Sequence, residues 1–432
     1  MQKKKRKGLA VIYRQEIIQD ISLFTSAPKA KYYDELFLNL DLSSFPENFA
    51  KTGRKGYSKT SLLCAFIVMK LECFAYITEL LDYLQNNLLI AYYCGFDITK
   101  SLPSYWTFDR FIRNIDNQLL KKLMSSVVIQ LADMGVVDTS FIALDSTPIN
   151  ANTKLNNLKS FVSNKFSKDN HPKNDNDCGL GVHTASNQHN ERNFEYYWGY
   201  KNHILVDCIS GLPIYELTTT ADVSDSTVAV DILKETNKFL SVRECSFIAD
   251  KGYDVKKIYN TVKDIYSGDC FIPLNKRNSK KIKLVNEHPI CEAGLSMHKD
   301  GRFSDNGRTR QKYCCPGKRS KSFSCPCNHK NRNNGKKCRG CTKYITIPND
   351  YRLSIDRECI SFKKAYSLRT EVERYNARFK QTGQERLWTH SLSAAQNLNT
   401  ITHIALLAVA FAAVVTKSKL SFRALKSVKR IA

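Results

Sequence analysis

Apolar residues recur at three- and four-residue intervals through two long stretches in the first third of the chain. One stretch runs from Ser58 to about Asn86, and the other runs from Thr107 to about Met134. This spacing places the apolar side chains on one face of a helix, and Ser58 is a residue type that caps helix N-termini. Because each helix would have an apolar face to bury, the sequence predicts an all-helical domain over residues 1–137.

Strand-like runs replace the helical spacing after residue 137. The apolar run from Phe141 to Leu144 is halted by Asp145, which predicts a buried strand that ends at this acid. Residues 196–222 contain two strand-like runs about a Ser-Gly-Leu-Pro turn, which predicts a hairpin. A helical pattern follows at residues 225–240, and a second buried strand is expected to end at Asp250.

The remaining segments complete an α/β order. Residues 160–193 are almost entirely polar, which predicts a mobile loop. We therefore expect an α/β fold with a mixed sheet flanked by helices and an N-terminal all-helical domain. The sheet domain is predicted to occupy residues 138–284 and 346–416, with a basic cysteine-rich insertion at 285–345 and a basic tail at 417–432.

Neither end of the chain predicts a membrane segment. The apolar run from Ile401 to Val415 contains Thr402 and His403 and is shorter than the roughly 20 residues that cross a bilayer. We expect it to be a buried core helix. The basic start MQKKKRKG leads into no apolar segment, so the sequence predicts no secretory signal and a cytoplasmic protein without a membrane partner.

The excess of basic over acidic residues indicates that this globular protein attracts polyanions. Lys and Arg number 66 against 41 Asp and Glu, which gives a formal net charge of +25. A field of this sign concentrates polyanions around the molecule, so nucleic acid is the favoured partner. An anionic membrane surface, or solubility alone, stays as the alternative.

Three acids stand out against this basic background. Asp145 and Asp250 each follow an apolar strand, and ligands collect at the carboxyl ends of strands in α/β sheets. At about 100° per residue, the helix predicted over Ala365–Lys380 carries Glu373 on its polar face. Three carboxylates can hold two Mg²⁺ ions about 4 Å apart for displacement at phosphorus. The alternative is that Glu373 forms an ordinary surface ion pair with Arg369.

The helix that carries Glu373 also carries a family signature. Its spacing, Tyr366-x2-Arg369-x3-Glu373-x6-Lys380, resembles the Y-R-E-K signature of a group of bacterial insertion-sequence transposases. The segments ALDSTPINANT and IADKGYD are similar to those around the first two acids of that family, and SYWTFDRF is similar to part of its helical accessory region. The resemblance implies a DDE transposase with a ribonuclease-H-like catalytic core.

By position, the resemblance implies that Asp145, Asp250 and Glu373 are the catalytic acids and bind two Mg²⁺ ions, with Mn²⁺ as an alternative. Glu371 is the rival third acid, but it projects about 160° around the helix from Glu373. Asp225 is similar to a further recurrent acid of the family. Two roles stay open for Asp225, namely capping the helix that follows it and supporting catalysis.

Basic and aromatic residues of the signature are expected to contact DNA. The resemblance implies this role for Tyr366, Arg369 and Lys380 near the reacting phosphate. Arg forks onto phosphate oxygens, Lys acts as a point charge, and Tyr stacks or donates a hydrogen bond. Lys201 and His203 flank the predicted hairpin, and for them a DNA-facing role and plain solvation both stay open.

The insertion is rich in cysteine and in basic residues. Seven of the fifteen cysteines lie between Cys291 and Cys341, and residues 276–343 contain 19 Lys and Arg against four acids. Paired thiols in a reducing compartment favour a structural Zn²⁺ site, whereas the alternative is a flexible basic loop. Either form is expected to lie on phosphate backbone. The predicted zinc ligands are drawn from Cys325 or Cys327, Cys338, Cys341, and Cys314 or Cys315, with Cys291, His288, His298 and His329 as further options.

These features together predict an enzyme that moves DNA. The resemblance implies cut-and-paste transposition of an insertion sequence, with strand cleavage at terminal inverted repeats and strand transfer to target DNA. It also implies a homodimer on double-stranded DNA, associated with the bacterial nucleoid. The alternatives are a non-catalytic zinc-containing DNA-binding protein derived from a transposase, and a nuclease that cuts without sequence preference.

Overall fold

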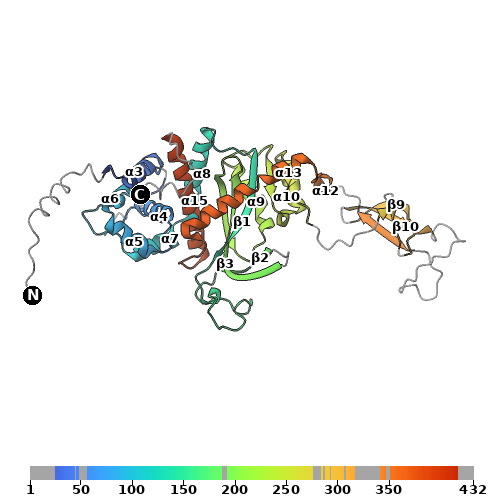
Figure 1. Ribbon diagram of the computed structural model, residues 1–432, viewed down its shortest axis with the longest axis horizontal. Helices are drawn as coiled ribbons and strands as arrows, with labels where there is room; N and C mark the ends of the chain where they lie inside the picture. The colour runs from blue at the N-terminus through green and yellow to red at the C-terminus, as the bar shows by residue number, and fades with distance from the viewer. Residues whose placement is uncertain are drawn as a thin grey trace, which may run out of the picture.

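A six-stranded mixed sheet lies at the centre of the molecule, with helices on both of its faces (Figure 1). The computed structural model describes residues 25–43, 45–47, 56–186, 192–275, 284–285, 288–291, 293–305, 308–316, 341–346 and 351–416. The strands are ordered β2-β3-β1-β5-β6, and β4 also pairs with β3. They span β1 Phe141–Asn150, β2 Gly179–Ser186, β3 Arg192–Asp207, β4 Pro213–Thr220, β5 Ser246–Ala249 and β6 Asp269–Phe271.

The direction of the strands matches the expected ribonuclease-H-like sheet. Strands β1 to β4 pair antiparallel, whereas β1 and β5, and β5 and β6, pair parallel. The predicted hairpin is confirmed, because β3 and β4 pair directly on either side of a turn that contains Gly211. The predicted α/β fold with a mixed sheet is therefore confirmed.

Two expectations about the strands are wrong. β1 does not end at Asp145, which is the fifth of its ten residues. The strand continues because β3 pairs with it as far as Asn150. β5 pairs with β1 only as far as Leu144, so Pro148, which has no backbone N–H, breaks no hydrogen bond between β1 and β5. The predicted mobile loop at residues 160–193 contains β2, which is held by pairing with the first half of β3.

The N-terminal region consists of helices, as predicted, but each long stretch forms two of them. The first breaks at Cys73, whose φ is +60°, and the second breaks at Ile115, whose backbone is extended. Ser58 caps the first helix as predicted, since its side chain accepts a hydrogen bond from the Ser61 N–H. The helices are α3 Pro28–Asn39, α4 Lys59–Leu71, α5 Ile77–Asn86, α6 Leu88–Tyr93, α7 Tyr105–Asn114 and α8 Asn117–Asp133.

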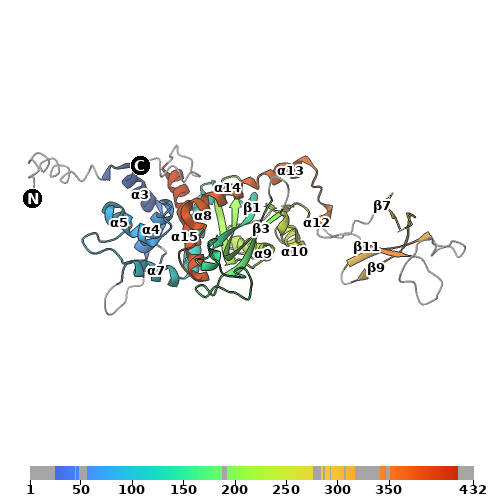
Figure 2. The same ribbon diagram turned by 60° about the horizontal axis from the view of Figure 1, so that its bottom comes forward.

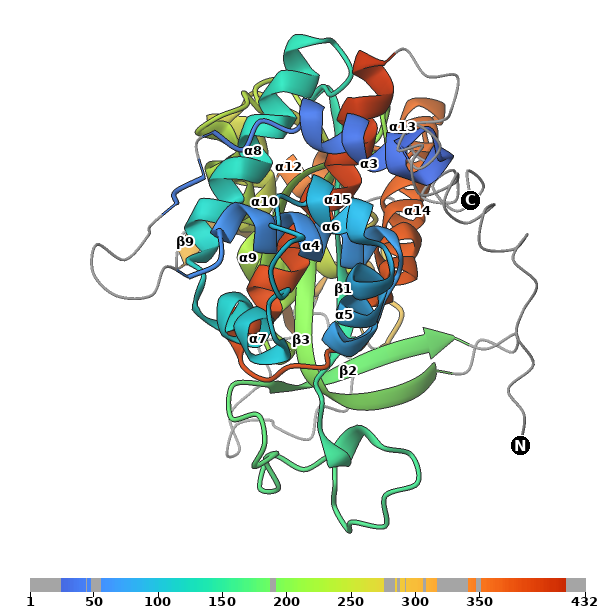
Figure 3. The ribbon, with the colours of Figure 1, turned by 90° about the vertical axis from the view of Figure 1, so that its left-hand side faces the viewer.

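The helix α15, Leu392–Val415, joins the helical region to the sheet. It packs against α3, α4, α7 and α8 on one side and β4 on the other (Figure 3). At 24 residues it is longer than predicted, and it is the one described helix that is long and apolar enough to cross a membrane. Because 78% of its most apolar window is buried within the fold, it is the core helix that we expected.

Helices on opposite faces of the sheet carry the rest of the core. Figure 3 shows α9 and α10 on one face and α13 and α14 on the other. Figure 2 shows α14, α13 and α12 following one another beside the sheet. Their bounds are α9 Asp225–Asn237, α10 Lys256–Asn260, α12 Tyr351–Ser354, α13 Ile360–Ser367 and α14 Thr370–Phe379, with short helical turns η1 Lys154–Asn156, η2 Lys251–Tyr253, η3 Thr261–Ile265 and η5 Lys380–Gln384.

Part of the insertion forms small sheets of its own. A three-stranded antiparallel sheet has the order β11-β10-β9, and a two-stranded pair precedes it. A small cluster of buried side chains packs beside them, including Met297 and Tyr313. The strands are β7 Leu284–Val285, β8 His288–Pro289, β9 His298–Asp305, β10 Arg308–Cys314 and β11 Thr342–Thr346.

Candidate active site

Asp145 and Asp250 are neighbours across the parallel ladder of the sheet. The pairing of β1 with β5 ends at Leu144 and Ala249, so the next residue on each strand is one of the two acids. Adjacent strands lie about 4.8 Å apart, which places the two backbones within carboxylate reach of a common ion. Two acids that are about a hundred residues apart in the chain are therefore brought together by strand register alone.

Asp145 is held between a cation and an amide from α14. The Asn376 Nδ2 atom donates to its Oδ2 at 3.1 Å, and an Arg369 nitrogen lies 3.8 Å from its Oδ1. The pKa of Asp145 is raised to about 6, mainly by burial, with smaller contributions from the charges of Asp250 and Asp225, while the charge of Arg369 opposes the rise. An ion or a second cation is needed to keep this carboxylate ionised at little cost.

The turn after β5 fixes Asp250. Its Oδ1 accepts the Gly252 N–H at 2.7 Å, so this acid caps the short turn η2. A Cβ on Gly252 would lie 2.9 Å from the same oxygen, so a larger residue there would disturb the carboxylate. The absence of a side chain at Gly252 therefore leaves room for the Asp250 carboxylate.

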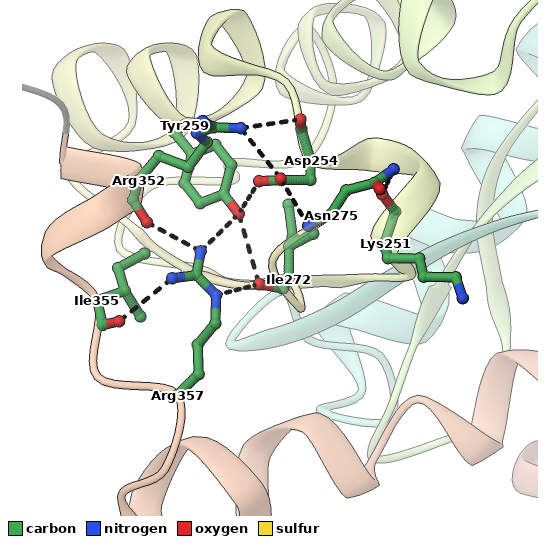
Figure 4. Close-up of polar contacts among 8 residues, drawn as sticks. All are labelled: Lys251, Asp254, Tyr259, Ile272, Asn275, Arg352, Ile355 and Arg357. Carbon is green, nitrogen blue, oxygen red and sulfur yellow. Dashed lines mark hydrogen bonds and ion pairs between the residues drawn. The ribbon is translucent and has the colours of Figure 1, made fainter. Parts of the chain in front are cut away.

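A network of hydrogen bonds and ion pairs holds the segment that follows this turn (Figure 4). Asp254 Oδ2 accepts the Asn275 N–H at 2.9 Å and pairs with Arg352 Nη1 at 3.0 Å. Arg357 donates to the Tyr259 hydroxyl at 3.1 Å and to the Ile272 carbonyl at 2.9 Å. The network ties the segment after Asp250 to the two places where the chain leaves for the insertion and returns from it.

Arg369 links the third predicted acid to the first. Its Nη1 lies 2.5 Å from Glu373 Oε1, while its Nη2 faces Asp145. Glu371 instead pairs with Arg374. Among the described residues, no three His, Cys, Asp or Glu side chains form a metal-binding group in this conformation. The guanidinium of Arg369 lies between Glu373 and Asp145.

The helix that was predicted over Ala365–Lys380 is interrupted. α13 ends at Ser367, and a turn at Leu368 and Arg369 precedes α14. Tyr366 still lies close to the acids: burial raises the pKa of its hydroxyl, the charge of Arg369 opposes this rise, and the charges of the acids, first of all Asp250, add to it. Lys380 lies beyond α14 in a wide helical turn and approaches Glu385 at 3.5 Å. The structure thus places Tyr366 and Arg369 beside the acids and Lys380 farther along.

A cavity of about 500 Å³ opens over the two strand acids. Lys201 and Asp225 meet inside it, with Nζ 3.0 Å from Oδ1. His203 is fully buried and faces Asp225, so plain solvation, one of its two open roles, is wrong, while contact with DNA stays a prediction. The residues that line the cavity are Asp145, Ser146, Pro148, Val182, His183, Tyr197, Lys201, Asp225, Asp250, Lys251, Gly252 and Asn275.

Three buried polar atoms in or next to this cavity lack a hydrogen-bond partner within the described residues. The Tyr197 hydroxyl belongs to a lining residue, whereas His203 Nδ1 and Arg369 Nε belong to residues that face the lining acids Asp225 and Asp145. Buried polar atoms are normally paired, so such atoms indicate a missing ligand or water. Oxygen donors from carboxylates are the ligands that Mg²⁺ prefers, so the residues around the cavity fit a divalent ion.

Sequence reasoning missed Asn376 and Tyr197. Asn376 lies three residues after Glu373, which is one helical turn on the same side, so its spacing could have indicated it. Tyr197 had no such signal, because it lies in the part of β3 that pairs with β2, a strand that we did not predict.

The predicted zinc ligands are only partly described. Cys291 and Cys315 are buried in one small cluster with Cys341 packed against it, and the Cys315 N–H donates to the Cys341 carbonyl at 3.0 Å. Cys314 is buried at the end of β10. Zinc in the insertion stays a prediction, because Cys325, Cys327, Cys338 and His329 lie outside the described residues.

Comparison with known proteins gives two family matches. A model described as a transposase DDE domain matches residues 137–408, and one described as a transposase domain matches residues 22–114. No curated protein matches. A solved structure described as the piggyBac transposase synaptic complex with hairpin DNA is similar at a TM-score of 0.40 and 11% identity, over 94% of this chain and 77% of that chain. The first model covers well over half of the chain and includes Asp145, Asp250 and Glu373.

Proposed function

The chain belongs to the DDE transposase family, and we propose that it performs cut-and-paste transposition of an insertion sequence by divalent-metal-dependent chemistry. In this proposal it binds the terminal inverted repeats of its element as a homodimer in the bacterial cytoplasm. It then cleaves the DNA strands at those ends and joins the freed 3′-hydroxyls to target DNA.

The observation that carries the proposal is the position of Asp145 and Asp250. Strand register brings them together beneath one cavity, and α14 packs across β1 with Arg369 and Asn376 directed at Asp145. A basic protein with paired carboxylates in a cleft is suited to phosphate chemistry, because the bases attract DNA and the acids attract cations.

Each of these side chains has a distinct part in the proposed reaction. Asp145, Asp250 and Glu373 would hold two divalent ions, Mg²⁺ or Mn²⁺, which when bound activate the attacking oxygen and stabilise the leaving one. Asn376 orients Asp145 through its amide hydrogen bond.

Arg369 and Tyr366 face the place where a phosphate would lie. A DNA phosphate offers Arg369 a bidentate partner, and its arrival would free Glu373 to turn toward the other acids. In this proposal Asp145 and Asp250 bind metal without DNA, and DNA adds Glu373 to their site.

The test is cleavage of a DNA fragment that carries the inverted repeats flanking the element, in the presence of Mg²⁺. Asp145→Asn and Asp250→Asn are expected to lower the cleavage rate at least 1000-fold, because each removes a ligand of the ions, while binding to the repeats is retained. Asp231→Asn, an exposed position on α9, is the matched control and should cleave normally.

Two outcomes would contradict the proposal. If the wild-type protein binds the repeats but neither Mg²⁺ nor Mn²⁺ supports cleavage, the protein is a DNA binder rather than an enzyme. If it cuts DNA that lacks the repeats equally well, it is a nuclease without sequence preference.

A further inference from the structure

Asp225 begins α9 but does not cap it. The N-cap residue is Ser224, which makes no capping hydrogen bond with its side chain, and Asp225 lies in the first helical turn. Its Oδ1 instead accepts a bond from Lys201 Nζ, which also donates to the Val223 carbonyl at 3.0 Å. The capping role that we considered is therefore excluded, and the carboxylate points toward the sheet.

The same carboxylate shares its surroundings with the two strand acids. Asp225, Asp145 and Asp250 all line the cavity of about 500 Å³. Lys201, the partner of Asp225, lines it as well. The three carboxylates therefore open onto the same space.

His203 is a second, independent sign that this volume takes a ligand. Its side chain is completely buried, and its Nε2 is engaged with Thr219 Oγ1 at 2.9 Å. Its Nδ1 has no hydrogen-bond partner among the described residues, and it lies 3.8 Å from Asp225 Oδ1. That distance is too long for a hydrogen bond, so Nδ1 faces the Asp225 carboxylate without bonding to it.

We propose that Asp225 is a fourth carboxylate of the metal site, with the Lys201 ammonium holding its place until a divalent ion binds. This inference rests on the proposed metal-dependent function. Hard divalent ions prefer carboxylate oxygens, and an ammonium is the weaker partner for a carboxylate that can reach such an ion. Lys201 is then released toward the DNA backbone, where a point charge binds phosphate.

The test is Mn²⁺ binding to the full-length protein without DNA, measured from the paramagnetic resonance signal of free Mn²⁺. Asp225→Asn should weaken Mn²⁺ binding about tenfold or more. Lys201→Met should leave binding unchanged or tighten it, because it removes the competing cation. Asp231→Asn, an exposed acid on the same helix, should bind Mn²⁺ like the wild type.

A double variant guards against misfolding. Asp225→Asn combined with Lys201→Met leaves neither charge unpaired, and it should bind Mn²⁺ as weakly as Asp225→Asn alone. Wild-type Mn²⁺ affinity in both Asp225 variants would overturn the inference and leave Asp225 as a positioning residue for Lys201.

Asp145→Asn separates this failure from failure of the proposed function. If Asp145→Asn weakens Mn²⁺ binding and Asp225→Asn does not, only the fourth ligand is wrong. If neither variant weakens it, the metal site itself is wrong.

Discussion

Asp145 costs the protein stability when no ion is bound. Its pKa is raised to about 6 because burial disfavours the charged form more than Arg369 favours it. A carboxyl group with a raised pKa binds its proton more tightly in the folded state than in the unfolded state. The contribution of Asp145 to the free energy of unfolding is therefore largest below about pH 4 and is lost as the pH rises to 6.

Asp145→Asn is accordingly expected to stabilise the metal-free protein. Near pH 7 the free energy of unfolding should increase by about 3 kcal/mol, since the variant carries no buried charge to desolvate. The difference from the wild type should vanish below about pH 4. Urea denaturation across this pH range measures the effect, with Asp231→Asn as the control. A loss of stability at pH 7 would show that Asp145 is well paired without metal.

Arg369 is expected to compete with metal ions for the acids. It lies between Asp145 and Glu373, so its guanidinium attracts both carboxylates in the metal-free protein. Arg369→Gln should tighten Mn²⁺ binding by roughly fivefold to tenfold while it slows strand cleavage, because the same side chain is proposed to bind phosphate.

Arg374→Gln is the matched control for this prediction. Arg374 pairs with Glu371 on the same helix, away from Asp145, so its loss should change neither Mn²⁺ affinity nor cleavage. Equal effects of the two substitutions would mean that general charge, and not the position of Arg369, controls the site.

Among the elements, the insertion is the most separable. Asn275 and Arg352 both bond to Asp254, so the departing and returning chains are clamped together on the catalytic core (Figure 4). A short linker can therefore close the gap that removal of the insertion leaves. The basic charge of residues 276–343 would be lost with it.

Replacement of residues 285–345 by a short Gly/Ser linker should leave the core folded. The free energy of unfolding of the core is expected to change by no more than about 1 kcal/mol, because loop-closure entropy depends weakly on length. DNA affinity should fall and become less salt-dependent, since fewer phosphates are neutralised. Calorimetry and binding at two salt concentrations measure both effects. Collapse of the core would show that the insertion packs on it.

Elements also show where sequence patterns were insufficient. The helices of the N-terminal region followed from apolar spacing, but their breaks at Cys73 and Ile115 did not, because periodicity continues across a short turn. β2 was missed because the segment around it is rich in Asn, Asp, Lys, His, Ser and Gly, and because it forms by pairing with β3. Backbone pairing between distant segments leaves no local pattern.

At the scale of the whole molecule, one hydrophobic core runs from the N-terminal helices into the sheet. Eleven of the thirteen residues of α4 are buried, many of them beneath α15 from the other end of the chain. A polar network accompanies this packing. Lys70 donates to Gln384 at 2.6 Å, Gln384 donates to Asn399, and Asn399 donates to Thr218, while burial lowers the pKa of Lys70 to about 7.

The fragment of residues 1–137 is therefore expected not to fold alone. Without α15 its helices expose the apolar surface that they bury in the full chain, and Lys70 loses its partner. Near-ultraviolet circular dichroism should show no fixed packing. A fusion of 1–137 to residues 392–415 through a flexible linker should restore a cooperative thermal transition. Cooperative unfolding of the fragment alone would support the independent domain predicted from the sequence.

The sequence alone determined the kinds of element, the fold class and the family. Apolar spacing specifies helices and strands locally, and the signature from Tyr366 to Lys380 is a local pattern as well. Only the tertiary structure decided that Asp145 stands beside Asp250, that Arg369 occupies the space between Asp145 and Glu373, and that Asp225 faces the cavity rather than its own helix. These relations depend on strand register and side-chain packing between segments far apart in the chain, which no local spacing encodes.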